Sequence, residues 1–220
     1  LYRITLFGSF LTVLVLNVGC LYAQVEPKFG RLSLLEGSSE MKAYKNDLQS
    51  GMNFTEKHQG LLLNEGLPQL FLDGNRLERS QVRQRLQKVF FDSISDPTAY
   101  KTARDLAVTQ LSTLARSKEI SINGSINAAL FLGELKEQKG LLVTAATEPL
   151  SELVSDATLT PSVRIAALLG LGNRVKEARE SANGSPTAAN IVGIIPTMEQ
   201  VISLPGEQLP AIARDWMQAR

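Results

Sequence analysis

Apolar residues recur at helical spacing through most of the C-terminal two thirds of the chain. The first clear stripe contains Val82, Leu86, Val89 and Phe90, with basic residues between them. Spacings of three and four residues put the apolar side chains on one face of a helix and the charged side chains on the other. The pattern therefore predicts a helix that begins near Leu77 and packs through this face.

Capping signals mark the starts of later helices. Asp96-Pro97 and Thr160-Pro161 each place an N-cap side chain before a proline, which loses nothing at the first helical position. With the apolar pattern, these signals predict helices over 97–117, 122–139, from 147 and from 161 to about 182, and two more after Pro196 and from Pro205. The best strand candidate, residues 191–195, is short, so the chain is predicted to be all-α.

Residues 24–75 lack this regularity, because glycine or proline interrupts them every few positions. Ser33 and Glu36 have capping-box spacing, which predicts a short helix after Ser33. We expect an irregular N-terminal section over 24–75 and a helical-repeat domain over 76–220.

Two of the predicted helices share a pattern 39 residues apart. When residues 125–135 are aligned with residues 164–174, apolar and small residues coincide along both segments. The matching pairs are Ile126 and Ile165, Ala128 and Ala167, Leu130 and Leu169, Leu132 and Leu171, and Gly133 and Gly172. A fixed period of this size is typical of a helical unit stacked along an axis, and small residues let neighbouring helices approach closely.

Residues 160–172, Thr-Pro-Ser-Val-Arg-Ile-Ala-Ala-Leu-Leu-Gly-Leu-Gly, resemble the first helix of a HEAT-type (armadillo-like) repeat, in which Val-Arg-x-x-Ala and a later Leu-Gly are common. The resemblance extends over 122–174, although Ser125 stands where that family often has arginine. It implies a right-handed α-solenoid of stacked antiparallel helical hairpins, and the alternative is an Ala/Leu-rich helical bundle. In the repeat register Leu130 and Leu169 are predicted to be equivalent and buried, each costing about 2–5 kcal/mol when changed to alanine.

The first 23 residues have the pattern of an export signal. Arg3 precedes an uncharged, mostly apolar run, and Ala23 offers a small residue for cleavage. An uncleaved membrane anchor is the alternative, since this run is just long enough to span a bilayer. Cys20 adds a lipoprotein alternative. Bacterial lipidation sites resemble Leu-x-x-Cys, but here Asn17 stands at the position of the leucine. We expect an exported protein (periplasmic, secreted or cell-surface) that meets a membrane only through this segment, if it is retained.

Composition and charge exclude several classes of function. The 220 residues are 44% hydrophobic and 20% charged, which is typical of a globular protein. The net charge is +1, and loss of Arg3 with the first 23 residues would leave 22 basic and 22 acidic side chains (23 − 1 = 22). We therefore expect no nucleic-acid partner. Without Cys20, the single cysteine, the mature chain would form no disulfide.

Few residues carry recognisable chemistry. His58 is the only histidine, lies in a polar stretch and is predicted to be a solvated surface residue. Catalytic triads, zinc or copper sites and phosphate-binding glycine loops have no matching pattern, so we expect no catalytic, cofactor-binding or metal-ligating residue. The densest basic cluster is predicted to be a solvated helix face; it consists of Arg76, Arg79, Arg83, Arg85 and Lys88.

Three Asn-x-Ser/Thr sequences begin at Asn53, Asn123 and Asn183. In a eukaryotic secretory pathway they would be glycosylation acceptors on surface loops. The two Asn-Gly-Ser copies are equally well explained as turns between helices.

These observations favour a non-catalytic module that binds or scaffolds another protein. Partner contact is expected on outward positions of the second helix of each hairpin, namely Glu152, Ser155, Glu199 and Gln200. The alternatives are an extracytoplasmic enzyme that uses carboxylates alone, the non-catalytic part of such an enzyme, or a fragment. The last of these is prompted by the absence of a polar cap after the final predicted helix.

Overall fold

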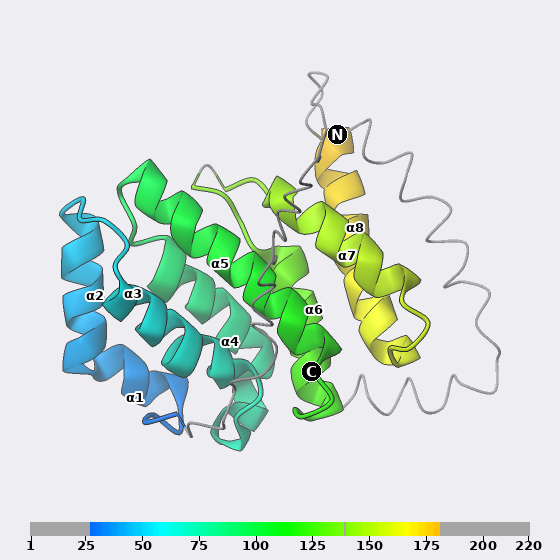
Figure 1. Cartoon of the computed structure of the whole chain (residues 1–220), viewed down its shortest axis with the longest axis horizontal. Helices are drawn as coiled ribbons and strands as arrows, with labels where there is room; N and C mark the ends of the chain where they lie inside the picture. The colour runs from blue at the N-terminus through cyan, green and yellow to red at the C-terminus, as the bar shows by residue number, and fades with distance from the viewer. Residues whose placement is uncertain (1–26, 139, 181–220) are drawn as a thin grey trace, which may run out of the picture.

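The computed structural model describes residues 27–138 and 140–180, and within these ranges the chain is all-helical, as the sequence predicts. The α-helices are α1 (Leu32–Gly37), α2 (Ser39–Gln49), α3 (Glu56–Gly60), α4 (Arg79–Leu86), α5 (Pro97–Arg116), α6 (Ile122–Glu134), α7 (Thr147–Ser155) and α8 (Pro161–Glu180). Two π-helical segments, η1 (Leu61–Gly66) and η4 (Gln87–Phe91), and three 3-10 segments, η2 (Leu67–Leu70), η3 (Asp73–Glu78) and η5 (Thr144–Ala146), join them. The helices lie side by side, with α1 and α2 at one end and α7 and α8 at the other (Figure 1).

The predicted starts of α5 and α7 and the end of α5 are confirmed. Asp96 caps α5 by accepting a hydrogen bond from the Ala99 N–H at 2.7 Å, and the helix ends at Arg116. The predicted start of α8 at Pro161 is also confirmed, and the predicted helices beyond residue 180 lie outside the described residues.

The predicted end of α6 at residue 139 is wrong, because the helix ends at Glu134. The chain then makes a tight loop in which the Val143 N–H donates to the Leu135 carbonyl at 2.9 Å. Gly140 has a φ of +81° at the turn of this loop, a conformation that favours glycine. The Tyr100 hydroxyl also donates to the Lys136 carbonyl, so a side chain from α5 holds the chain out of the helix.

Helix α1 is not capped by Ser33 as the sequence predicts. It begins one residue earlier, at Leu32, whose N–H donates to the Asn75 side-chain oxygen at 3.1 Å. Asn75 is buried and donates in turn to the Gln69 side chain at 2.8 Å. A polar network between residues distant in sequence therefore fixes the start of the helix.

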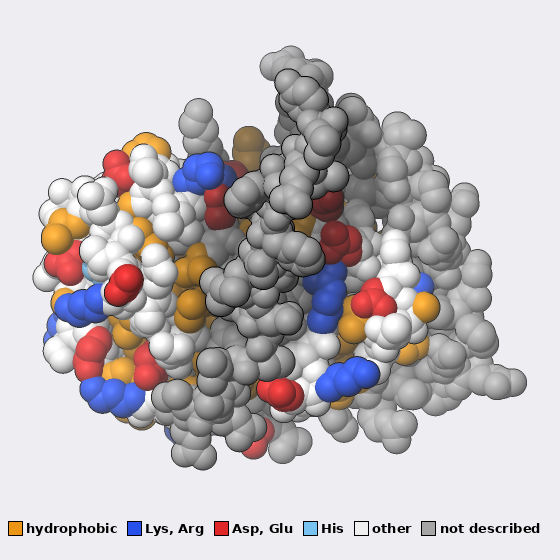
Figure 2. Space-filling model, in the orientation of Figure 1, with side chains coloured by type: hydrophobic (Ala, Val, Ile, Leu, Met, Phe, Trp, Pro, Cys, Tyr) orange, Lys and Arg blue, Asp and Glu red, His pale blue; other side chains and the backbone are white. Residues whose placement is uncertain are grey.

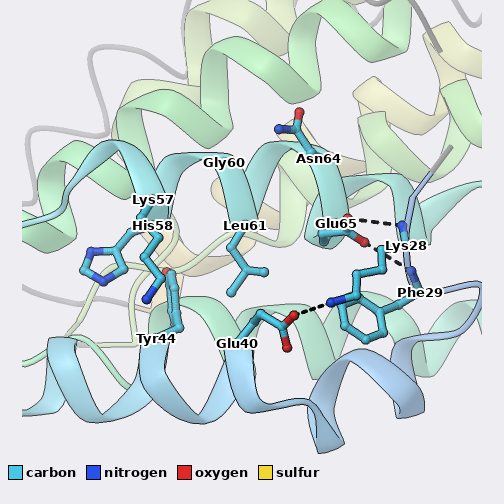
Figure 3. Close-up of a pocket in the computed structure, with 10 residues that line it drawn as sticks. All are labelled: Lys28, Phe29, Glu40, Tyr44, Lys57, His58, Gly60, Leu61, Asn64 and Glu65. Atoms are coloured by element: carbon cyan, nitrogen blue, oxygen red, sulfur yellow. Dashed lines mark hydrogen bonds and ion pairs between the residues drawn. The ribbon is translucent and has the colours of Figure 1, made fainter. Parts of the chain in front are cut away.

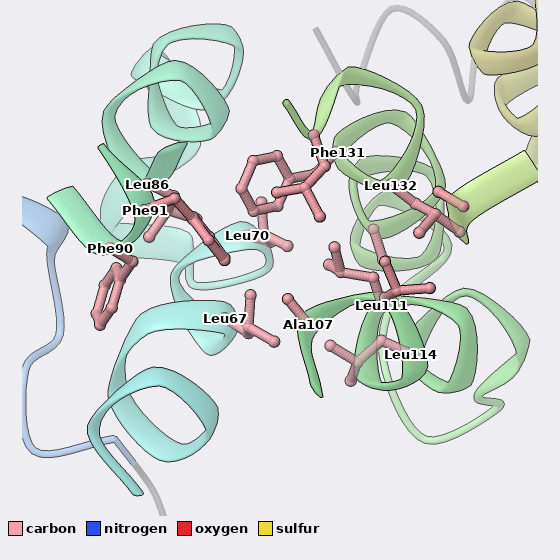
Figure 4. Packing of buried hydrophobic residues seen from close by; sticks show 14 of the residues in the cluster. Leu67, Leu70, Leu86, Phe90, Phe91, Ala107, Leu111, Leu114, Phe131 and Leu132 are labelled. Carbon is pink, nitrogen blue, oxygen red and sulfur yellow. The ribbon is translucent and has the colours of Figure 1, made fainter. Parts of the chain in front are cut away.

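One hydrophobic core runs through the described residues. The apolar face predicted from Val82, Leu86, Val89 and Phe90 is buried, which confirms that prediction. The section over 27–75 contributes to the same core through α1, α2, η1 and η2, and Figure 4 shows the meeting of η2, η4, α5 and α6. The buried apolar side chains that residues 27–75 contribute are Leu32, Leu35, Met41, Tyr44, Leu48, Leu62, Leu67 and Leu70.

Helices α6 and α8 cross at a pair of glycines. A Cβ atom added to Gly133 would lie 2.5 Å from the Gly170 Cα atom, so the backbones touch. The residue against Gly133 is therefore Gly170, while Gly172, its match in the 39-residue alignment, has open space around it. The two backbones can approach this closely only because both helices have glycine at the crossing.

Leu169 is not buried, so the prediction that Leu130 and Leu169 occupy equivalent buried positions is wrong. Its exposed fraction is 49%, and Leu130 is only partly buried. The buried residues of α8 recur along one face of the helix: Ser162, Val163, Ala166, Ala167, Gly170, Leu171 and Arg174. Leu169 projects from another side of the helix, because its position falls between those that recur every three to four residues on the buried face.

None of the helices in the described part of the chain is both long and apolar enough to cross a bilayer. Residues 1–23, which carry the predicted export signal, lie outside the described residues.

Candidate functional site

A recess of about 270 Å³ lies between α2 and the consecutive segments α3 and η1. Residues 28 and 29 close one end of it, ahead of α1 (Figure 3). The lining residues are Lys28, Phe29, Glu40, Tyr44, Lys57, His58, Gly60, Leu61, Asn64 and Glu65. All belong to the N-terminal section, residues 24–75, that the sequence predicts to be irregular.

Helix α2 supplies the base of the recess. Ser38 caps this helix by accepting a hydrogen bond from the Met41 N–H at 3.1 Å. The apolar spacing of Met41, Tyr44 and Leu48 then buries one face of the helix, and it is the sequence signal that could have identified α2. Tyr44 is fixed by its hydroxyl, which donates to the Phe90 carbonyl at 2.8 Å, and burial raises the pKa of this phenol above its ordinary value.

His58 is buried, so the prediction of a solvated histidine is wrong. Only 2% of the residue is exposed, because the Tyr44 and Phe54 rings lie 5.5 and 5.8 Å from the imidazole, centroid to centroid. The Thr55 N–H donates to His58 Nδ1 at 3.1 Å, so that nitrogen carries no proton. The proton is on Nε2, which lies 3.3 Å from an Asp47 carboxylate oxygen. Both ring nitrogens are therefore used to cap α3 and to join it to α2.

The rim of the recess carries charges of both signs, and three of its charged residues, Lys28, Glu40 and Glu65, already have partners. The Lys28 ammonium donates to the Glu40 carboxylate, and this hydrogen bond lowers the pKa of Glu40 to about 2. The two oxygens of Glu65 accept hydrogen bonds from the backbone N–H groups of Lys28 and Phe29 at 3.1 and 3.2 Å. Since two lysines, Lys28 and Lys57, and two glutamates, Glu40 and Glu65, line the recess, it presents little net charge.

Two rim side chains make no hydrogen bond or ion pair with any residue that the structure describes: Lys57 on α3 and Asn64 on η1. Both are exposed beside the recess. Phe29 and Leu61 are half-buried and give the recess an apolar floor with Tyr44. The arrangement is an apolar hollow with hydrogen-bonding groups at its edge.

The predicted partner-binding residues lie elsewhere. Glu152 and Ser155 are exposed on α7, at the end of the molecule opposite α2 (Figure 1). Glu152 accepts a hydrogen bond from the Arg116 guanidinium of α5 at 2.8 Å. Glu199 and Gln200 lie outside the described residues, so the structure does not bring the four together.

Two residues of the basic cluster, Arg83 and Arg85, are not solvated as the sequence predicts, whereas Lys88 is exposed and the side chains of Arg76 and Arg79 lie outside the described part. The Arg83 side chain is 11% exposed and bonds Glu134 at 2.9 Å and Asn127 at 2.7 Å, both on α6. Arg85 bonds Glu36 of α1 at 3.0 Å. These arginines face other helices because carboxylates far away in sequence meet them there. On the face drawn in Figure 2, acidic and basic side chains of the described part are intermixed, without a broad patch of one sign.

Within residues 27–138 and 140–180, no three His, Cys, Asp or Glu side chains gather as they would around a metal ion. Comparison with known proteins adds no relative: no family model, no curated protein and no solved structure matches the chain.

Proposed function

We propose that this chain is an exported, non-catalytic module that binds another protein, and that the recess between α2 and the α3–η1 segment receives an apolar side chain of the partner. The observation that carries the proposal is the composition of the recess, which has an apolar floor and a rim where Glu40 and Glu65 already have partners while Lys57 and Asn64 have none among the described residues.

The size of the recess suits a single apolar side chain. Pockets for small molecules usually span about 300–1,000 Å³ and bury most of the ligand. At about 270 Å³, this recess is slightly smaller than that range. It is large enough for one apolar side chain, with the rest of the partner lying across the rim.

The hydrogen bonds made by the titratable groups of the recess favour binding over acid–base chemistry. A general acid or base must reach the proton that it transfers. Both ring nitrogens of His58 are directed to Thr55 and Asp47, within the protein. Glu40 is held ionised by Lys28, and Glu65 accepts hydrogen bonds from two backbone amides.

The groups at the rim indicate the partner's chemistry. Lys57 offers an ammonium group, and Asn64 offers an amide that both donates and accepts. A partner segment that matches them has an apolar residue flanked by a carboxylate or carbonyl oxygen. Such rim contacts set specificity and association rate, while the buried side chain supplies most of the affinity.

We also infer that α6 and α8 are equivalent helices of a HEAT-type α-solenoid. Two of the five aligned pairs, 39 residues apart, are buried to the same degree, which supports this proposal. Ala128 and Ala167 are both fully buried, as are Leu132 and Leu171. The other three pairs differ, because Ile165, Leu169 and Gly172 are each more exposed than the matching residue of α6. In a solenoid of this kind the outward face of α7, with Glu152 and Ser155, remains the alternative contact surface.

Affinity capture with charge-reversed variants tests the proposed function. The full chain is used to capture proteins from the extracytoplasmic fraction, and the dissociation constant of each recovered partner is measured. Lys57→Glu should raise this dissociation constant about tenfold or more. The new carboxylate would face the oxygen that the partner presents to Lys57, and a tenfold change corresponds to about 1.4 kcal/mol of binding free energy. Lys136→Glu makes the same charge change at an exposed site after α6 and is the matched control.

Glu152→Lys distinguishes the two surfaces. Loss of affinity in this variant alone would assign binding to α7 and overturn the role of the recess. Equal affinity of all three variants would overturn both assignments. If the wild-type chain recovers no partner, the proposal of a binding module is wrong.

A further inference from the structure

Asn53 begins Asn53-Phe54-Thr55, one of three Asn-x-Ser/Thr sequences in the chain. It lies in the irregular stretch 52–55, which joins α2 to α3 at the end of the molecule where α1 and α2 lie (Figure 1). Gly51, with a φ of +84°, ends α2 and turns the chain into this stretch. The sequence motif therefore lies on an accessible connection between two helices.

The neighbours of Asn53 direct its side chain to solvent. Phe54 is turned inward, with its ring 6.4 Å from that of Tyr44, while Asn53 is exposed. Met52 beside it is also exposed, with an exposed fraction of 49%. An exposed asparagine side chain leaves room for a bulky polar group in the solvent.

Asn123 offers a contrasting environment for the same motif. It lies inside the first turn of α6, and its side-chain oxygen is buried. Gly124 is packed so closely that an added Cβ atom would lie 2.7 Å from that of Phe71. The Ser125 residue is 5% exposed, and its hydroxyl faces the Ser117 carbonyl at 3.5 Å. A sugar on Asn123 would have to displace the start of α6.

We infer that Asn53 is an acceptor for N-linked glycosylation and that Asn123 is not. The co-reactant is a lipid-linked oligosaccharide diphosphate. A bond forms between Asn53 Nδ2 and the anomeric carbon of the first sugar, and the bond from that carbon to the diphosphate oxygen breaks. Nδ2 loses one proton and the lipid diphosphate leaves, without oxidation or reduction. The inference requires passage through a secretory pathway but no property of the binding recess.

Secretion from a eukaryotic host tests this inference. The full chain is expressed with its own N-terminal segment and, in a second arm, behind an established secretion signal. Asn183→Gln is present throughout, so that the motif outside the described residues contributes nothing. Intact-mass analysis before and after amidase release of the glycan is made for the parent, Asn53→Gln and Asn123→Gln. Release also converts the modified asparagine to aspartate, which peptide mapping locates.

We expect a glycan on the parent and on Asn123→Gln, and none on Asn53→Gln. The released aspartate should map to residue 53. Secreted parent protein without a glycan, or a glycan mapped to residue 123, would overturn the inference. A glycan at residue 53 only in the second arm would support the acceptor site while contradicting the proposed export. Thr55→Ser keeps the motif and the hydroxyl beside His58, so it should remain glycosylated.

Discussion

Replacing Gly133 with alanine places a methyl group where α6 crosses α8. The added carbon would lie 2.5 Å from the Gly170 Cα atom, more than an ångström inside ordinary contact. The obstacle is backbone, so rotation of a side chain cannot relieve it. Overpacking of this kind costs about 1–3 kcal/mol, and a backbone clash belongs at the upper end of that range. Alanine recovers up to about 1 kcal/mol of helix propensity, so the net loss should be about 2 kcal/mol.

Gly172→Ala is the matched control for this prediction. It makes the same chemical change in α8, where an added Cβ atom would have open space. It should keep the gain in propensity and raise stability by up to about 1 kcal/mol. The free energies of unfolding of the two variants, measured by urea denaturation with far-ultraviolet circular dichroism, should then differ by about 3 kcal/mol. Equal effects, or greater destabilisation by Gly172→Ala, would refute the glycine crossing.

Three further predictions concern burial. Leu171→Ala should lower the free energy of unfolding by about 2–5 kcal/mol, and Leu169→Ala by about 0.5 kcal/mol or less, in urea denaturation. His58→Ala should lower it by about 1–3 kcal/mol, and His58→Gln by less, because glutamine can still receive the N-cap N–H. Burial and the nearby Glu137 carboxylate raise the pKa of Tyr100 to about 12. The free energy of unfolding should therefore fall as pH rises from about 10 to about 12. In the Tyr100→Phe variant this fall should be smaller.

The sign of the alkaline effect follows from proton binding. The folded protein keeps the Tyr100 proton to a higher pH than the unfolded chain, so alkali favours unfolding. Absorbance titration of a variant whose two N-terminal tyrosines are phenylalanine isolates Tyr44 and Tyr100, since the chain has four tyrosines. Ionisation of both near pH 10 in the folded protein would contradict their burial. Equal losses from Leu169→Ala and Leu171→Ala, or an unchanged stability of His58→Ala, would contradict the packing of α8 and α3.

The sequence predicted features whose causes are local. Asp96-Pro97 and Thr160-Pro161 each determine the start of a helix through two adjacent residues, and the structure has both helices beginning at these prolines. The end of α6 could not be predicted in this way, because a hydroxyl from α5 and the loop over 135–143 determine it. Contacts between distant residues also decided the start of α1, where Asn75 replaces the predicted cap.

The candidate site was largely invisible in the sequence. His58 stands among polar neighbours, and its burial comes from the Tyr44 and Phe54 rings, which close over it only after α2 and α3 pack. Leu169 was predicted to be buried and is exposed, the reverse of the outcome for His58. Its match to Leu130 implied a shared buried position, but burial depends on which neighbouring helix covers that side.

Site-specific photo-cross-linking tests the central claim, partner binding at the recess, most directly. A photoreactive residue is placed at Asn64 on the rim, at Ser155 on α7, or at Thr109, an exposed control position on α5. The chain is irradiated with the extracytoplasmic fraction, and covalent adducts are quantified by mass spectrometry. The account predicts a protein adduct from position 64 that position 109 does not give. Adducts confined to position 155, or equal adducts from positions 64 and 109, would contradict it.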